Sequence, residues 1–196
     1  MREDLRKNDP LQEDLSIIVD EIDRLTKVVN QLLQFAKPGS EVKTNVKIEE
    51  VINSTLVVLN HEAKQNDIVT HCQISNDLPM LATDEGAMKE VFFNLLHNAI
   101  QAMPNGGKIS IDAHYLHNNH AIQVTIADTG PGIPQESFQK IFEPFYTTKQ
   151  TGTGLGLSIV KKKLEDMDAT IHVENSGNGA SFIINFPLNE PALMPT

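Results

Sequence analysis

The stretch that most constrains the fold runs from Asp128 to Ser158 and reads DTGPGIPQESFQKIFEPFYTTKQTGTGLGLS. Its acidic residue falls just past a predicted strand, and two glycines follow, Gly130 and Gly132. A second cluster, with glycines at 152, 154 and 156, precedes a predicted helix over 157–167. Glycines allow close backbone approach, and a helix N-terminus offers unpaired N–H groups to an anion. We therefore expect the Asp128 carboxylate to read an adenine amino group and the second cluster to face phosphates.

A predicted helix over 84–103 supplies the polar side chains that would complete such a site. Its apolar residues recur with a period of 3.6, and the polar stripe opposite them holds Glu90, Asn94, His97, Asn98 and Gln101. Asparagine is a poor helix former, so two asparagines one turn apart need a reason. We interpret the side-chain oxygen of Asn98 as a Mg²⁺ ligand, and Asn94 as holding a metal-bound water or a phosphate oxygen. A solvated polar face is the alternative.

The composition limits the partners and the compartment. The formal net charge is −10, which argues against nucleic acid or an anionic membrane as the main partner. A polyanionic ligand would need compensation from Mg²⁺ and a few lysines. The single cysteine, Cys72, excludes an internal disulfide and indicates a reducing compartment, so we expect a cytoplasmic location, with Cys72 buried in a strand. No apolar run approaches the roughly 20 residues of a membrane span, so membrane contact is expected only through segments outside this chain.

The N-terminal segment, 1–38, carries a different repeat. Apolar residues alternate at spacings of four and three: Leu15, Ile18, Ile22, Leu25, Val29, Leu32 and Ala36. This spacing predicts a coiled-coil-like helix over about 14–37, which Ile17, Val28 and Leu33 widen toward a four-helix bundle. The sequence Lys37-Pro38-Gly39 ends it. We expect a homodimer through this helix; docking onto the rest of the same chain is the alternative.

Residues 41–188 predict one mixed α/β domain. Helical spacing covers 46–64, and alternation predicts strands over 68–74, 80–82, 108–115, 121–127, 169–174 and 180–187, the last two as a closing hairpin. Thr83 or Asp84 is the expected N-cap of the helix over 84–103. Residues 135–151 have no clean period and are predicted to form a mobile lid, and 189–196 a disordered tail. His114, His117 and His120 lack a thiolate or carboxylate companion, so we expect no metal site there.

Four blocks in order carry a resemblance to a known family: DEGAMKEVFFNLLHNAIQA, ADTGPGIP, FEPFYTTK and GTGLGLSIV. They resemble the N, G1, F and G2 boxes of sensor histidine kinases, most closely those of the nitrogen-regulator type. These kinases share the GHKL, or Bergerat, ATPase superfamily with heat-shock chaperones and mismatch-repair ATPases. The resemblance covers about residues 41–188. It implies an α/β sandwich with helices on one face of a mixed sheet, and ATP held between the helices and a lid.

The resemblance also assigns roles by position. It implies a cofactor-binding set of Asn94, Asn98, Asp128, Gly130, Gly132, Lys149, Gly152, Thr153, Gly154, Leu155, Gly156 and Leu157. Asn98 is then the metal ligand, Asp128 reads adenine, and Lys149 is the lid cation for the terminal phosphate. Glu90 or Asn94 would accept the proton of the attacking imidazole. The alternatives are a surface glutamate at Glu90 and a solvated lysine at Lys149. Phe142 and Phe145 are lid anchors or core residues.

The N-terminal helix resembles the second helix of the dimerisation and phosphoacceptor hairpin, but no histidine block precedes it. His61-Glu62 has the right dipeptide, yet it falls inside the ATP-binding domain, so we reject it as the acceptor. The resemblance therefore implies a fragment that binds ATP without phosphorylating itself. In the full enzyme the γ-phosphoryl group would pass to a histidine outside this chain and then to a response-regulator aspartate. A stand-alone ATPase or serine kinase of the anti-sigma-factor type, and a non-catalytic nucleotide-sensing module, are the alternatives.

Overall fold

The computed structural model describes residues 10–36, 43–149, 152–177 and 179–188. The chain divides into two compact units, Met1–Lys37 and Pro38–Thr196. Two sequence-based predictions, the helix end at Lys37-Pro38-Gly39 and the tail over 189–196, lie outside the described residues. None of the described helices is both long enough and apolar enough to cross a membrane.

The first unit contains one helix, α1 (Pro10–Ala36), of 27 residues. At 1.5 Å per residue it is about 40 Å long. Nine of its described large apolar side chains are between 39% and 65% exposed: Leu15, Ile17, Ile18, Val19, Ile22, Leu25, Val29, Leu32 and Leu33. The expected helix is therefore present and presents its apolar stripe to solvent, while its association with another helix stays a prediction.

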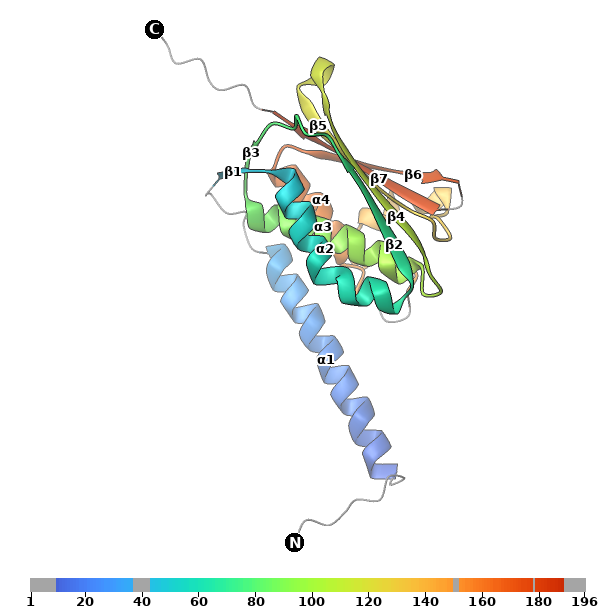
Figure 1. The fold of residues 1–196 in the computed structure, drawn as a ribbon. Coiled ribbons are helices and arrows are strands. Elements are labelled where there is room, and N and C mark those ends of the chain that lie inside the picture. The colour runs from blue at the N-terminus through green and yellow to red at the C-terminus, as the bar shows by residue number, and fades with distance from the viewer. Residues whose placement is uncertain (1–9, 37–42, 150–151, 178, 189–196) are drawn as a thin grey trace. The chain divides into compact units, whose positions relative to one another are not determined.

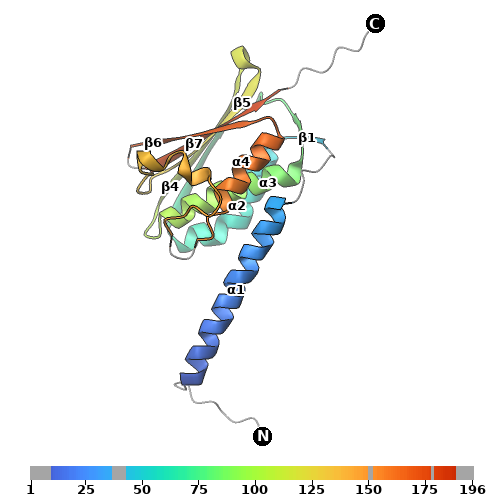
Figure 2. The ribbon, with the colours of Figure 1, turned by 180° about the vertical axis from the view of Figure 1, so that it is seen from behind.

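The second unit is a two-layer α/β sandwich, as expected (Figures 1 and 2). Its sheet has the order β2-β4-β5-β7-β6, formed by β2 (Ile68–Ile74), β4 (Gly107–Leu116), β5 (Ala121–Asp128), β7 (Gly179–Pro187) and β6 (Thr170–Ser176). The sheet is mixed, because β2 runs parallel to β4 and the other neighbours are antiparallel. A separate antiparallel pair joins β1 (Thr44–Val46) to β3 (Leu81–Thr83).

Three helices cover one face of this sheet: α2 (Ile48–Gln65), α3 (Glu85–Ala102) and α4 (Gly156–Asp166). The apolar stripe of α3 faces the sheet, and Met88, Phe92 and Leu95 are at most 1% exposed. From the sheet, Val124 and Ile126 of β5 pack into the same core. The period of 3.6 residues predicted from the sequence thus separates a buried face from a polar one, and the polar stripe of α3 is turned away from the core.

The start of α3 follows the expected capping chemistry. Asp84 is the N-cap residue, and its side-chain oxygen accepts a hydrogen bond from the Ala87 N–H at 3.0 Å. Such a cap satisfies one of the N–H groups that a helix leaves unpaired at its first turn. The cap thus fixes the residue at which α3 begins, and with it the position of the polar stripe relative to the neighbouring elements.

Two local expectations were wrong. Cys72 is exposed rather than buried, because β2 is an edge strand and has no neighbour on its outer side. Asp128 is the last residue of β5 rather than the residue after it. The segment expected to form a lid contains two short 3₁₀ helices, η2 (Gln135–Ser137) and η3 (Lys140–Phe142), and a third, η1 (His117–Asn119), joins β4 to β5. The mobility of the lid stays a prediction.

Candidate nucleotide-binding site

The second glycine cluster lies against the asparagines of α3. Gly156 is the first residue of α4, and a Cβ atom placed on it would lie 3.2 Å from Asn94 Oδ1 and 3.9 Å from Asn98 Nδ2. A side chain at 156 would therefore crowd Asn94 and touch Asn98. The N-terminus of α4, where backbone N–H groups are unpaired, thus meets the polar stripe of α3.

Asn94 is held in a defined orientation. Its Nδ2 donates to the backbone carbonyl of Glu90 at 2.9 Å, so its Oδ1 is the atom that faces Gly156. The Glu90 carboxylate forms an ion pair with Lys163 of α4 at 3.0 Å, and both side chains are less than a quarter exposed. Glu90 therefore joins α3 to α4 and is not the freely solvated glutamate that a surface position would give.

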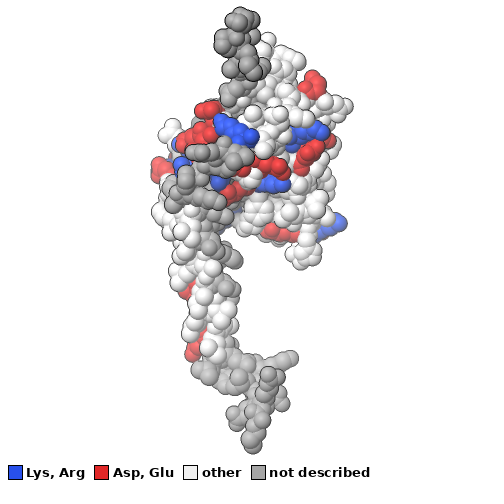
Figure 3. Space-filling view, turned by 90° about the vertical axis from the view of Figure 1, so that its left-hand side faces the viewer, with Lys and Arg blue, Asp and Glu red and all other residues white. Residues whose placement is uncertain are grey.

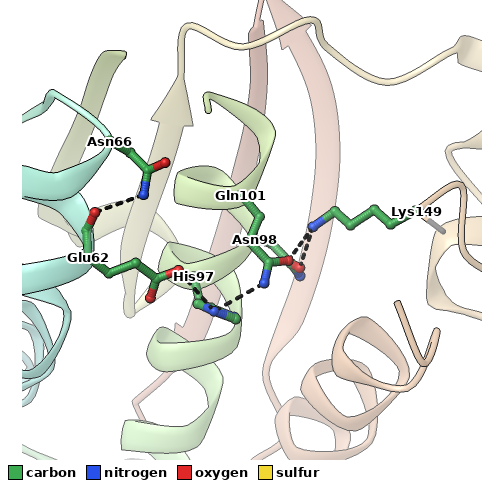
Figure 4. A network of polar contacts seen from close by, with 6 residues as sticks. All are labelled: Glu62, Asn66, His97, Asn98, Gln101 and Lys149. Carbon is green, nitrogen blue, oxygen red and sulfur yellow. Dashed lines mark hydrogen bonds and ion pairs between the residues drawn. The ribbon is translucent and has the colours of Figure 1, made fainter. Parts of the chain in front are cut away.

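Lys149 reaches from the lid segment to the polar stripe of α3 (Figure 4). Its ammonium donates to Asn98 Oδ1 at 3.2 Å and to Gln101 Oε1 at 2.8 Å. Partial burial lowers the pKa of Lys149, because desolvation disfavours the charged ammonium. Asn98 Oδ1, the oxygen assigned to Mg²⁺ from the sequence, thus already accepts a hydrogen bond from a cationic group in this structure, the Lys149 ammonium.

The contacts of Lys149 continue across α3 to α2. Gln101 Nε2 lies 3.1 Å from His97 Nε2, which in turn lies 3.3 Å from a carboxylate oxygen of Glu62. The ring of Phe93 stacks on His97 with 5.5 Å between the ring centroids. Figure 4 shows Glu62, His97, Gln101 and Lys149 as parts of one polar network that runs from α2 to the lid. Sequence analysis placed Gln101 and His97 on the polar stripe but gave neither a partner.

Asp128 is 8% exposed and is oriented by the backbone. Its Oδ1 accepts from the Gly130 N–H at 2.8 Å and from the Ala180 N–H at 3.2 Å. Both bonds use the same oxygen. The second oxygen, Oδ2, accepts no hydrogen bond within the described residues. Because no fully buried side-chain nitrogen or oxygen there lacks a partner, Oδ2 is in contact with solvent. The carboxylate therefore presents one acceptor to a ligand while the protein fixes the other.

The first glycine cluster fits closely beside this carboxylate. A Cβ atom on Gly130 would lie 2.9 Å from Asp128 Oδ1 and 3.3 Å from the side chain of Met103. Gly132 has a φ of +71°, which is the left-handed region that favours glycine. A larger residue at 130 would displace the carboxylate or the methionine, and the close approach of this loop to a nucleotide base stays a prediction.

The lid contacts the second glycine cluster through its backbone. The Phe145 N–H donates to the Gly154 carbonyl at 2.9 Å, and a Cβ atom on Gly154 would lie 2.4 Å from the Phe145 carbonyl carbon. A Cβ atom on Gly152 would lie 2.5 Å from Thr147 Oγ1. The contact between FEPFYTTK and GTGLGLS therefore has no room for side chains at 152 and 154.

The aromatic and leucine residues of these loops divide between core and solvent. Phe142 packs against the core, whereas Phe145 is 61% exposed and has a φ of +68°. Leu155 is 1% exposed and Leu157 is half-buried against the core, so both side chains serve packing. Thr153 lies between Gly152 and Gly154, and its hydroxyl oxygen accepts from the Leu155 N–H at 3.4 Å. Phe142 is thus a core residue, and Phe145 is not.

An α/β sandwich with two asparagines one turn apart on α3, an aspartate at the end of β5 and two glycine clusters is the arrangement expected of a nucleotide-binding domain. A sequence profile of the family described as histidine kinase-, DNA gyrase B- and HSP90-like ATPases matches residues 83–190. The match spans more than half of the chain, and the chain belongs to this family. The expected resemblance to the ATP-binding catalytic domain of sensor histidine kinases is confirmed.

The curated relatives are longer kinases. The chain is 34% identical to Sporulation kinase A of Bacillus subtilis (strain 168) over 173 residues, which are 87% of this chain and 28% of that protein. It is also 34% identical to the signal transduction histidine-protein kinase AtoS of Escherichia coli (strain K12) over 184 residues, 93% of this chain and 30% of that protein. The chain therefore spans less than a third of the length of these two relatives.

Solved histidine kinases share the fold. The nucleotide-free catalytic domain of ThkA is 35% identical, with a TM-score of 0.68 over 74% of this chain and 95% of that one. ThkA in complex with the response regulator protein TrrA is 31% identical, with a TM-score of 0.77 over 94% of this chain and 54% of that one. Full-length ShkA in complex with AMPPNP is 26% identical, with a TM-score of 0.77 over 92% and 39%.

Proposed function

We propose that this chain is the part of a two-component sensor kinase that binds Mg²⁺–ATP and delivers its γ-phosphoryl group to a histidine on another segment. The phosphoryl group then passes to an aspartate of a response regulator. One observation carries the proposal: Gly156, at the N-terminus of α4, lies against Asn94 and Asn98. Two solved relatives, one with AMPPNP and one with a response regulator, support the ligand and the partner.

The residues around Asn98 fit a magnesium ion. Its Oδ1 and the Oε1 of Gln101 are neutral oxygens that hold the Lys149 ammonium. Mg²⁺ prefers oxygen ligands, keeps several waters and is commonly held by one or two protein groups together with phosphates. Asn98 would therefore hold the ion, and the bound ion would neutralise charge on the phosphates. Among the described residues no cluster of three or more His, Cys, Asp or Glu side chains offers another metal site.

The chain's own residues would mainly orient the nucleotide. Asp128 Oδ2 would accept from the adenine amino group, and the N–H groups at the start of α4 would face the phosphates. Lys149 would leave Asn98 and bind the terminal phosphate. Phosphoryl transfer needs positioning and charge neutralisation more than covalent chemistry, and these groups provide both.

Of the two groups expected to accept the proton of the attacking imidazole, only Glu90 can do so, because the neutral amide of Asn94 is too weak a base. Glu90 lies one helical turn before Asn94 and is bonded to it through its carbonyl. Its carboxylate is paired with Lys163, so it could accept a proton only through the oxygen that faces away from that lysine. Asn94 would position the phosphate or a metal-bound water.

This fragment would not phosphorylate itself. His61 lies on α2 within the catalytic unit and is 2.9 Å from Gln65, in an exposed polar pair. The exposed apolar stripe of α1 fits a homodimer that brings a phosphoacceptor hairpin near the site. It also favours a kinase over a stand-alone ATPase or serine kinase. We place the activity in the cytoplasm.

Titration calorimetry with AMPPNP, with and without Mg²⁺, tests nucleotide binding. In the wild type Mg²⁺ should tighten binding about 10-fold or more, and Asn98→Ala should remove most of that gain. Asn53→Ala, an exposed asparagine on α2, is the matched control and should behave as wild type. If Asn98→Ala and Asn53→Ala respond equally to Mg²⁺, the metal assignment is wrong.

Transfer is tested by mixing the chain with a kinase-dead dimerisation hairpin that keeps its histidine, and adding labelled ATP. The hairpin should acquire an acid-labile label, because phosphohistidine hydrolyses in acid. An acid-stable label would indicate a serine kinase. Nucleotide binding without any label on the hairpin would favour a nucleotide-sensing module.

A further inference from the structure

The loop that follows β5, residues 129–134, carries both glycines of the first cluster. It contains two prolines, which have no N–H to donate. Within the described chain, the hydrogen bonds that link residues 130–133 to another strand both come from the side chain of Asn175. Asn175 Oδ1 accepts from the Ile133 N–H at 3.0 Å, and Asn175 Nδ2 donates to the Ile133 carbonyl at 2.8 Å. This side chain therefore takes the place of a neighbouring strand.

The same hairpin also holds the carboxylate. Asn175 of β6 is directly opposite Ala180 of β7 in the sheet register. The Ala180 N–H donates to Asp128 Oδ1, and a Cβ atom on Gly179 would lie 1.9 Å from the Asp128 carbonyl oxygen. One rung of the β6–β7 hairpin thus touches both the aspartate and the glycine loop. β6 and β7 are adjacent at one edge of the sheet in Figure 1.

We propose that Asn175 is a positioning residue for the nucleotide base, because it ties the loop of Gly130 and Gly132 to the hairpin that orients Asp128. The inference rests on the proposed function. Asn175 touches no ligand group itself; it acts by keeping the loop at a fixed distance from Oδ2 of Asp128. The amide of Asn175 carries its acceptor and its donor on two adjacent atoms, which match the N–H and the carbonyl of Ile133.

The first measurement needs no nucleotide. Amide hydrogen exchange at Ile133 should be several-fold faster in Asn175→Ala than in the wild type, because its acceptor is lost. Asn175→Asp has the same size but no donor, and its carboxylate would face the Ile133 carbonyl, so it should also loosen the loop. Ser176→Ala, at the adjacent and exposed position, is the control and should leave exchange at Ile133 unchanged. Unchanged exchange at Ile133 in Asn175→Ala overturns the inference.

The second measurement compares bases. Asn175→Ala should weaken binding of AMPPNP roughly fivefold or more, the scale of one or two lost hydrogen bonds. Binding of the guanine analogue GMPPNP should hardly change, so the adenine-to-guanine preference should fall, as it should in Asp128→Asn. Equal weakening for both analogues would indicate general loss of structure and would contradict base positioning. Thermal unfolding identifies any variant that fails to fold.

The two measurements separate the inference from the function it rests on. If the wild type binds AMPPNP in an Asp128-dependent way while Asn175→Ala keeps both its affinity and its base preference, the positioning role is wrong and the function stands. If Asp128→Asn folds like the wild type and binds AMPPNP equally well, the base site is misassigned. The positioning role of Asn175 is then wrong as well.

Discussion

The ammonium of Lys149 lies 3.2 Å from the side-chain oxygen of Asn98 and 2.8 Å from that of Gln101. In the proposed function the same Asn98 oxygen holds Mg²⁺, so a lysine and a metal ion would use one acceptor at different stages. Nucleotide binding would then include an exchange: the metal takes Asn98, and the lysine moves to the terminal phosphate. The lid segment that carries Lys149 would be repositioned by this exchange.

Lys149→Met should therefore lower the rate of phosphoryl transfer more than it lowers affinity for ATP. Removing one group that stabilises developing charge typically costs about 100-fold in kcat. Single-turnover transfer to a separate hairpin, measured with saturating ATP, checks this. Lys140→Met, at an exposed lysine of η3, is the matched control and should keep the wild-type rate. Equal rates for the two variants would remove Lys149 from the catalytic groups.

Two glycines with the same backbone conformation allow a second test. Gly154 and Gly177 have φ values of +69° and +64°, so alanine at either costs about 1 kcal/mol through backbone strain. Only Gly154 is also crowded: its Cβ would meet the Phe145 backbone at 2.4 Å, whereas nothing lies within 4 Å of a Cβ on Gly177.

Gly154→Ala should thus weaken AMPPNP binding about 10-fold or more, because the lid must move away from the second glycine cluster. Gly177→Ala should lower the melting temperature by no more than Gly154→Ala does, and it should leave AMPPNP binding nearly unchanged. Calorimetric titration and thermal unfolding of both variants check the difference. A loss of binding in Gly177→Ala as large as that in Gly154→Ala would show that strain alone, and not the lid contact, controls the site.

Much of the fold could be predicted because its signals are local. The 3.6 period placed α3 and the alternation placed β4, β5 and β7 within a residue or two of their observed ends. Asn94 and Asn98 were found because asparagine is unfavourable inside a helix. The stretch from Asp128 to Gly156 was found because its glycines stand at strand and helix ends.

The remaining site contacts depend on distant parts of the chain. Lys149 and Gln101 are 48 residues apart, and Asn175 and Ile133 are 42 residues apart, so no periodicity links them. Gly179 was interpreted only as part of a hairpin turn, although it packs on the Asp128 backbone. The exposure of Cys72 follows from the strand order, which alternation alone does not contain. Such contacts become visible only when the sheet is assembled.

The environment of Cys72 gives a prediction for pH. Its pKa is raised, first by partial burial and second by the nearby carboxylate of Asp112 on β4. The thiolate is the reactive form, so alkylation by iodoacetamide should be slow at neutral pH and should rise toward alkaline pH. Asp112→Asn removes the negative charge, which lowers the pKa, so alkylation near pH 8 should be several-fold faster.

Because Cys72 is the single cysteine, the rate of alkylation reports on it alone. Asp77→Asn, an exposed aspartate in the turn after β2, is the control and should keep the wild-type pH profile. Identical profiles for Asp112→Asn and the wild type would mean that burial alone raises the pKa. In both variants an asparagine replaces an aspartate of nearly the same size, so the packing of the sheet should be preserved.

On the face that Figure 3 shows, the charge of the second unit is distributed rather than concentrated. In Figure 3 the described acidic and basic side chains of the catalytic unit alternate in small patches. The described apolar side chains of α1, in contrast, form a continuous stripe that includes Leu25 and Val29, at 55% and 53% exposed. A helical stripe of this kind is stable in water mainly when a second helix covers it. The first unit is therefore where self-association should be tested.

Leu25→Glu should convert a dimer into a monomer. Each copy would lose one buried leucine, and two such losses cost about 3–6 kcal/mol, which weakens association roughly 100-fold or more. Thr26→Glu introduces the same charge at the next position, outside the apolar repeat, and should leave the dimer intact. Sedimentation equilibrium at micromolar concentration distinguishes the two variants. A wild-type chain that stays monomeric would mean that the stripe of α1 is not the dimer seam. A Thr26→Glu variant that dissociates as readily as Leu25→Glu would mean the same, because a charge would then act regardless of which face of the helix carries it.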